Sequence, residues 1–473
     1  LFIAPRQRSY HSSEFEAIPV RYVPSLPSGL YPGLRIVAPG NRHIDHILET
    51  EEVDVLQLTG QGLLSLSALS AARRTGIPVV HSLHTLFFDE DYLRYGFYFR
   101  RASLESVPHK LTEARGMGVA MQKPLKTAAG AAAWRLIGRF VRRSDVTTAP
   151  SAYVCRMLAR RFPGSRLIRI DNGVEIPGDE VEIPGYVAVT AGNREPDPGT
   201  LPGSGVEISA CGAGPARQAS TRQASTRTPV SESATAPAEY RGASGTASGT
   251  AAETASRVEE NDVFAGGGKT FLFAGRLGEE KSVGVLLEGV RRARLKDPEI
   301  RLLIAGEGPG GDRYRRIVRE RGLGDAVYFL GRLPRRDLTE SGLLQRVRAA
   351  VTASTTENQP LSLIEAIVCG TPIIVPDLPA VGELLEGNGL SFPAGDAGAL
   401  ADRLVRMACD DELYLRFAQK SLRLREKFDA ARIAERYEAL YRELVAGGSG
   451  HTAAGQSASR PSSKPAAEGT GRR

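Results

Sequence analysis

The chain has 473 residues, of which 41% are hydrophobic and 24% are charged. This composition is ordinary for folded proteins and excludes a chain that is disordered throughout, and the length suffices for two domains. The four cysteines, Cys155, Cys211, Cys369 and Cys409, form neither a Cys-x-x-Cys pair nor a metal-ligand spacing, which disfavours a disulfide framework and favours a reducing cytosol.

A strongly basic segment lies in the first half of the chain. Residues 92–143 contain eleven Lys and Arg against two Glu, an excess of nine that exceeds the net charge of +7 of the whole chain. Its last part, AAAWRLIGRFVRR, places Trp134, Ile137, Phe140 and Val141 at helical spacing, with arginines on the remaining arc. Such a helix could lie on an anionic membrane, each basic residue adding roughly 1 kcal/mol. The alternatives are a solvated basic face and packing of Trp134 and its neighbours on a domain core.

Two segments have the composition of disordered chain. Residues 177–268 contain ARQASTRQASTR and SGTASGTAAETAS, and residues 446–473 are rich in Gly, Ser, Ala and Pro. Such segments bury too little apolar surface to offset the entropy of ordering. Strands alternate with helical patterns on both sides of the first segment. We therefore expect two doubly wound α/β domains, residues 1–176 and 269–445, separated by a disordered insertion and followed by a disordered tail.

Three strand ends in the second domain carry candidate ligand-binding residues. The strand FLFAG leads to Arg276, with Lys281 five residues later, and both cations could close on a diphosphate. The strand RLLIAG leads into a glycine-rich turn at Gly306 and Gly308, where backbone can approach a ligand.

The third strand end carries two glutamates eight residues apart. In TENQPLSLIEAIVCG, an apolar run ends near Glu357, and a short helix closed by Cys369-Gly370 carries Glu365. Ligands of open α/β sheets bind outside the carboxyl ends of the strands, where helix N-termini favour phosphate. The junction therefore predicts a sugar-nucleotide site.

The ordered set AGRLGEEK, LLIAGEGP, VYFLGRL and TENQPLSLIEAIVCGTPIIV resembles the nucleotide-sugar-binding half of the retaining glycosyltransferases of family 4, marked by Glu-x7-Glu. In the first half, IPVVHSLHT resembles the family's strand that ends in an active-site His, here His84. Two departures stand out: Asn-Gln-Pro follows Glu357 in place of the more usual Gly-Phe-Gly, and the chain begins within what should be the second strand. On that basis we expect on the order of 30 further residues at the amino terminus, enough for one βα unit.

The resemblance implies the GT-B fold, two Rossmann-like domains facing across a cleft, with the last helix, within residues 411–444, crossing back to the first domain. It implies hexose transfer from a nucleoside diphosphate sugar with retention of configuration. The implied catalytic residues are Glu357, His84, Arg276 and Lys281. The implied donor-binding residues are Glu365, Gly306, Gly308, Arg332, Pro360, Leu361, Ser362 and Leu363. No Asp-x-Asp sits at a strand end, so we expect neither a metal nor another cofactor.

The candidate residues on the acceptor-binding side of the cleft are supported by resemblance alone. HTLFFDEDYLRYG resembles a segment of family members that glycosylate lipids, which makes Asp91 and Tyr92 candidate acceptor-side residues together with Ser151 and Asn172. We accordingly expect a membrane lipid as acceptor, an anionic membrane surface as partner, and a cytoplasmic protein bound peripherally. The alternatives are a glycosyltransferase with a soluble acceptor, such as an exopolysaccharide, and a non-catalytic protein that binds nucleotide sugar or nucleic acid. Nucleic acid is disfavoured because aromatic residues make up only 6% of the chain and no recognisable nucleic-acid module is present.

Overall fold

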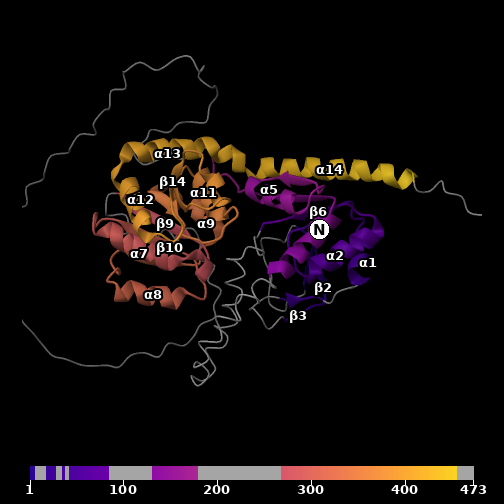
Figure 1. The fold of residues 1–473 in the computed structure, drawn as a ribbon, viewed down its shortest axis with the longest axis horizontal. Coiled ribbons are helices and arrows are strands. Elements are labelled where there is room, and N and C mark those ends of the chain that lie inside the picture. The colour runs from indigo at the N-terminus through magenta and orange to yellow at the C-terminus, as the bar shows by residue number, and fades with distance from the viewer. Residues whose placement is uncertain (6–17, 28–34, 38–41, 85–129, 179–267, 455–473) are drawn as a thin grey trace, which may run out of the picture. The chain divides into compact units, whose positions relative to one another are not determined.

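The computed structural model describes residues 1–5, 18–27, 35–37, 42–84, 130–178 and 268–454 (Figure 1). They fall within one compact unit, formed by Leu1–Ala188 together with Gly249–Arg473. The predicted insertion at 177–268, the predicted tail at 446–473 and residues 92–129 of the basic segment lie largely outside the described residues.

The carboxyl-terminal half is built on a parallel sheet of six strands. They are β9 (Thr270–Ala274), β10 (Arg301–Ala305), β11 (Val327–Gly331), β12 (Ala349–Val351), β13 (Ile373–Pro376) and β14 (Gly389–Phe392). Their order is β11-β10-β9-β12-β13-β14, and every neighbouring pair is parallel. In chain rank this is 3-2-1-4-5-6, the order of dinucleotide-binding folds. The order reverses between β9 and β12, and a ligand crevice is expected outside the carboxyl ends of these two strands.

Helices cover both faces of this sheet. They are α7 (Val283–Arg294), α8 (Gly311–Glu320), α9 (Arg335–Glu340), α10 (Leu343–Arg346), α11 (Leu361–Val368), α12 (Ala397–Cys409) and α13 (Asp411–Leu424), with short 3-10 turns at Glu279–Lys281, Val381–Leu384 and Arg425–Phe428. Alternation along β9 explains the two layers: Phe271 and Phe273 join the core with α7 and α12, whereas Leu272 joins the core with α11.

The amino-terminal half contains a second parallel sheet, with the order β5-β6-β7-β8. Its strands are β5 (Leu56–Leu58), β6 (Val79–Ser82), β7 (Val146–Ala149) and β8 (Leu167–Arg169), and its helices include α1 (Arg42–Thr50), α2 (Leu63–Thr75) and α5 (Ala152–Arg161). Two small pairs precede it: β1 (Phe2–Pro5) with β2 (Val20–Val23), and β3 (Leu26–Pro27) with β4 (Arg35–Ile36). The prediction of two α/β halves with parallel sheets is confirmed.

The helix formed by residues 130–143 does not have a free apolar face. Ile137 and Phe140 are completely buried and Val141 is 2% exposed. Trp134 packs against the core that contains Ile137 and Val141, whereas Phe140 joins the core with α1 and α2. The Phe140 ring stacks on His81, with 5.0 Å between ring centroids. The apolar stripe of this helix is therefore buried in the protein core and is not available to a membrane, whereas contact of its basic residues with an anionic membrane surface stays a prediction. The alternative, packing on the domain core, is the one observed.

The last helix, α14 (Ala430–Ala454), returns to the amino-terminal sheet as predicted. Ile433 and Leu440 form one core cluster with Val80 of β6 and Val146 of β7. The Tyr437 hydroxyl lies 3.1 Å from Thr148 Oγ1 and thus ties the helix to β7 by a polar contact as well.

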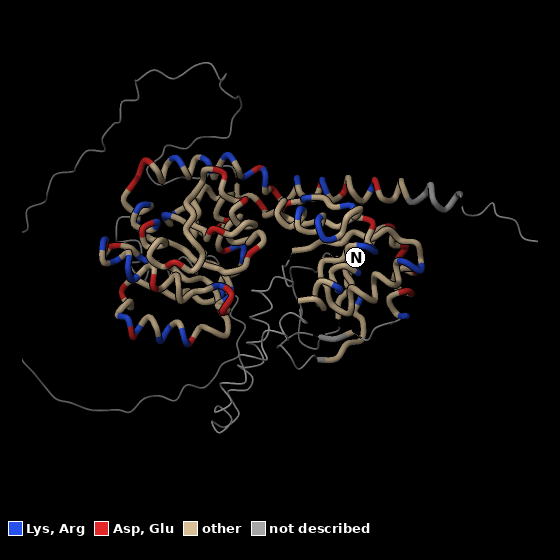
Figure 2. The backbone as a smooth tube through the Cα atoms, viewed as in Figure 1, with Lys and Arg blue, Asp and Glu red and all other residues tan. Residues whose placement is uncertain are grey.

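Charge is unevenly distributed along the described helices. In α13 the acidic residues Asp411 and Glu412 come first and basic residues follow, whereas Arg alternates with Glu along the first part of α14 (Figure 2). Within the described ranges, every helix is too short or too polar to span a bilayer.

Candidate nucleotide-sugar site

A pocket of about 950 Å³ opens where the strand order reverses, in the size range of small-molecule sites. It is lined by residues that follow β9, β10, β11 and β12 and by the first turn of α11. The lining includes nearly all the predicted catalytic and donor-binding residues: His84, Arg276, Lys281, Gly306, Gly308, Arg332, Glu357, Pro360, Leu361, Ser362 and Glu365.

Three ion pairs organise the charges of this pocket. Arg276 pairs with Glu280, Lys281 pairs with Glu357, and Arg335 pairs with Glu365. The Glu357 side chain is 11% exposed and that of Glu365 is 6% exposed, so both carboxylates are largely removed from water. A buried carboxylate is costly without a partner, and each of these has one cation. An anionic ligand would compete with the carboxylates for the same cations.

Two loops are packed together by glycine. Gly306 has φ +139°, and a Cβ placed there would lie 1.9 Å from the Gly275 carbonyl oxygen. A Cβ on Gly308 would lie 2.7 Å from the backbone nitrogen of Leu277. The glycines thus let the loop after β10 lie against the loop after β9 while both line the pocket. These glycines therefore allow two backbone segments of this chain to pack closely. The sequence interpretation had assigned them only to a close approach between backbone and ligand.

The first turn of α11 supplies backbone donors to the pocket. The helix follows Pro360, and Leu361 and Ser362 occupy its first two positions, whose N–H groups have no acceptor within a helix. Leu363 differs from its predicted role. Its side chain is 2% exposed in the core, and its N–H donates to the Pro360 carbonyl at 3.2 Å. Leu363 therefore supports the helix rather than lining the pocket.

His84 lies two residues beyond the end of β6 and lines the pocket from the amino-terminal half. Its Nδ1 is 3.0 Å from Asn172 Oδ1. Burial lowers the pKa of His84, although the contact with Asn172 partly opposes that change. His81, completely buried on β6, has its pKa lowered to about 4, chiefly by burial. Both shifts favour the neutral form of the imidazole.

Ser151 and Asn172 do not line the pocket. Ser151 is 1% exposed; its hydroxyl accepts from Val154 N at the start of α5 and donates to Asn358 Oδ1 at 2.7 Å. Asn172 binds Gln359 through two hydrogen bonds. Both predicted acceptor-side residues are thus engaged by the two residues that follow Glu357.

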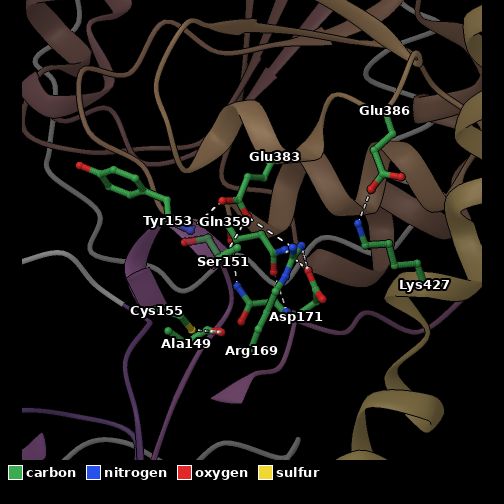
Figure 3. A network of polar contacts seen from close by, with 12 residues as sticks. Ala149, Ser151, Tyr153, Cys155, Arg169, Asp171, Gln359, Glu383, Glu386 and Lys427 are labelled. Carbon is green, nitrogen blue, oxygen red and sulfur yellow. Dashed lines mark hydrogen bonds and ion pairs between the residues drawn. The ribbon is translucent and has the colours of Figure 1, made fainter. Parts of the chain in front are cut away.

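Figure 3 shows this polar network around Ser151, Gln359, Asp171 and Glu383. Glu383 accepts hydrogen bonds from the backbone N–H groups of Ala152 and Tyr153, at 2.8 and 2.7 Å. Its carboxylate thereby satisfies donors at the first turn of α5, where the helix dipole favours negative charge.

Asp91 and Tyr92 lie outside the described residues. The sequence interpretation missed Arg335, Glu280 and Glu307, which also line the pocket. Glu280 stands four residues after its partner Arg276, a spacing that could have suggested the pair. Arg335 stands 30 residues before Glu365, and only the fold brings the two together.

Comparison with known proteins shows that each half of the chain matches a glycosyltransferase family model. Residues 2–176 match the family model described as Glycosyltransferase Family 4, and residues 257–423 match Glycosyl transferases group 1. The crystal structure of HepE from Anabaena, in complex with UDP, aligns with a TM-score of 0.54 at 16% identity, covering 91% of this chain and 88% of that one.

Among curated proteins, phosphatidyl-myo-inositol mannosyltransferase of Mycobacterium leprae is 30% identical over 189 residues, which is 38% of this chain and 48% of that protein. An exopolysaccharide phosphotransferase of Streptomyces coelicolor is 30% identical over 184 residues, 38% of this chain and 19% of that protein. The matches thus span less than half of either relative. The two family models, in contrast, lie one on each half of the fold described above. The chain belongs to the GT-B glycosyltransferases that join a family 4 amino-terminal domain to a group 1 carboxyl-terminal domain.

Proposed function

We propose that this protein transfers a hexose from a nucleoside diphosphate sugar to a hydroxyl group, with retention at the anomeric carbon. One observation carries the proposal. Three ion pairs, each with a largely buried carboxylate, converge with His84 on one pocket at the reversal point of a dinucleotide-type sheet. That combination suits a ligand with a diphosphate, a ribose and a sugar.

Donor binding would exchange partners within the pocket. The diphosphate would take Arg276 and Lys281 from Glu280 and Glu357, with further donors from the first turn of α11. Glu357, released from Lys281, would accept hydrogen bonds from sugar hydroxyls. Glu365 would accept from the two ribose hydroxyls, since one carboxylate can bind a vicinal diol.

The chemical step would break the bond between the anomeric carbon and the diphosphate oxygen and form one to the acceptor oxygen on the same face. The leaving diphosphate would take the acceptor's proton. Arg276 and Lys281 would stabilise the negative charge that develops on it, so the reaction would require no metal ion. The enzyme's main contribution would be to position and electrostatically stabilise the reacting groups.

The acceptor would be a lipid at an anionic membrane surface, reached from the cytoplasmic side. Helix 130–143 and helix α5 together carry seven arginines and no acidic residue. A second pocket, of about 490 Å³, lies between them and is lined by Trp134, Tyr153, Arg156, Met157, Arg160 and Arg161. This cationic surface supports membrane contact by charge, without insertion of the buried stripe. The similarity to a phosphatidyl-myo-inositol mannosyltransferase favours the same acceptor class.

The test is transfer of radiolabelled sugar from UDP-glucose or GDP-mannose, supplied separately, to vesicles containing diacylglycerol, phosphatidylinositol and an anionic lipid. Label should enter the organic phase with wild-type protein and not with Glu357→Gln. Glu365→Gln should weaken nucleotide binding more than it lowers kcat. The double variant Arg160→Gln/Arg161→Gln should reduce transfer of sugar to vesicle lipid while leaving nucleotide affinity unchanged.

Label found only in aqueous products would replace the lipid with a soluble acceptor. Absence of turnover with every donor, combined with intact nucleotide binding, would leave a non-catalytic nucleotide-sugar-binding protein.

A further inference from the structure

Gln359, one of the three residues after Glu357 that depart from the family pattern, begins a chain of hydrogen bonds that ends at His84. Gln359 is 6% exposed. Its Nε2 donates to Asp171 Oδ1 at 2.7 Å, and its Oε1 accepts from the backbone N–H of Asn172 at 2.6 Å. Arg169 Nη2 donates to the same Asp171 oxygen at 2.8 Å. Figure 3 shows Arg169, Asp171 and Gln359 in this arrangement.

Each contact of Gln359 has only one possible direction. A carboxylate only accepts hydrogen bonds and a backbone N–H only donates, so the Gln359 amide cannot be reversed without losing both contacts. With its side chain held in this way, Gln359 presents its backbone carbonyl to Asn172. That carbonyl oxygen accepts a hydrogen bond from Asn172 Nδ2 at 2.9 Å.

The same argument about donors and acceptors applies to Asn172 and then to His84. A carbonyl oxygen only accepts, so the Asn172 nitrogen must face Gln359 and the Asn172 oxygen must face His84 Nδ1. That oxygen also only accepts. In a neutral imidazole the proton must therefore sit on Nδ1, and Nε2 is left with its lone pair.

We infer that Asn172 and Gln359 are positioning residues that hold His84 as its Nδ1–H tautomer, so that Nε2 accepts a hydrogen bond from a hydroxyl group in the pocket. This inference rests on the proposed function for the hydroxyl, because a nucleotide sugar or its acceptor would provide it. A phosphate oxygen, which has no proton at neutral pH, is not a partner for Nε2. Gln359, which departs from the family pattern, thus links the segment after β12 to the His84 imidazole at the end of β6 in the amino-terminal sheet.

The tautomer is measured directly by nitrogen NMR of the full chain labelled with ¹⁵N-histidine. The His84 signals are assigned by their loss in His84→Gln. In wild-type protein near pH 7.5, Nδ1 should resonate as a protonated nitrogen and Nε2 as an unprotonated one. Asn172→Ala removes the acceptor and should convert His84 to the Nε2–H form or to a mixture.

Glu383→Gln is the matched control. Glu383 caps helix α5 through the N–H groups of Ala152 and Tyr153 and pairs with Arg169 at 3.4 Å, but its contacts do not include His84, Asn172 or Gln359. It should leave the His84 tautomer as in wild-type protein. Wild-type protein with the proton on Nε2, or an unchanged tautomer in Asn172→Ala, would overturn the inference.

Kinetics supply a second readout. Asn172→Ala should lower kcat by about tenfold to a hundredfold through misplacement of His84, with affinity for UDP or GDP kept within about threefold. Equal loss of kcat and nucleotide affinity would indicate a general structural defect and contradict the positioning role. The NMR result requires no turnover, so it tests the tautomer even if the proposed transfer activity fails.

Discussion

Acid should destabilise this protein through His81. The imidazole is completely buried on β6 and stacks on Phe140, and its pKa is lowered from 6.5 to about 4, mainly because burial disfavours its charged form. In the unfolded chain it titrates near the ordinary value. Between these two pKa values the unfolded state binds a proton that the folded state does not.

The sign and size of the effect follow from this difference. Because the unfolded state binds more protons, the free energy of unfolding falls as pH drops from 6.5 towards 4. A difference of about 2.5 pKa units at about 1.4 kcal/mol per unit is reduced slightly by partial protonation of the folded state at pH 4, leaving about 3 kcal/mol. At pH 7 the contribution is near zero.

Urea unfolding of wild-type protein and of His81→Asn, at pH 7, 6, 5 and 4, measures this loss. Acidic residues contribute to both proteins, so the informative quantity is the difference between the two curves. Wild-type protein should lose about 3 kcal/mol more than the variant between pH 7 and pH 4. Phe271→Leu, at a buried position on β9, is the control: it should lower stability equally at each pH, since it removes packing and not a titrating group. Parallel curves for wild-type protein and His81→Asn would refute the reasoning.

Two other substitutions test how the site and the last helix are held. Gly306→Ala should cost about 2 to 4 kcal/mol of unfolding free energy, because its Cβ would meet the Gly275 carbonyl at 1.9 Å at a φ of +139°. The control Gly284→Ala, where a Cβ meets nothing within 4 Å, should be stabilising by up to about 1 kcal/mol, and similar melting temperatures for the two variants would contradict the packing argument. Leu440→Ala should cost about 2 to 5 kcal/mol in urea unfolding by opening a cavity between α14 and the amino-terminal sheet, whereas Val445→Ala, at a position 38% exposed, should cost under about 1 kcal/mol. Equal effects would mean that α14 is not held by this core.

Local sequence patterns were sufficient for the fold class and for most of the donor pocket. Strands followed by glycine turns and amphipathic helices predict parallel sheets, and carboxyl ends of parallel strands lie along one edge. Arg276, Lys281, Glu357 and Glu365 each stand within a few residues of such an end or on the helix that follows it. Their convergence could therefore be expected from chain order and resemblance together.

The tertiary structure alone decided which residues are partners. The pairing of Arg335 with Glu365 and the chain from Gln359 to His84 join residues 30 to 187 positions apart, and no local pattern encodes such contacts. Periodicity also could not tell a membrane-facing stripe from a core-facing one around Phe140, because both require the same helical spacing of apolar residues. What a side chain buries against depends on the neighbours that the whole fold supplies. The sequence by itself therefore determined the elements and the edge where ligands bind, whereas packing decided which face is buried and which polar group each side chain meets.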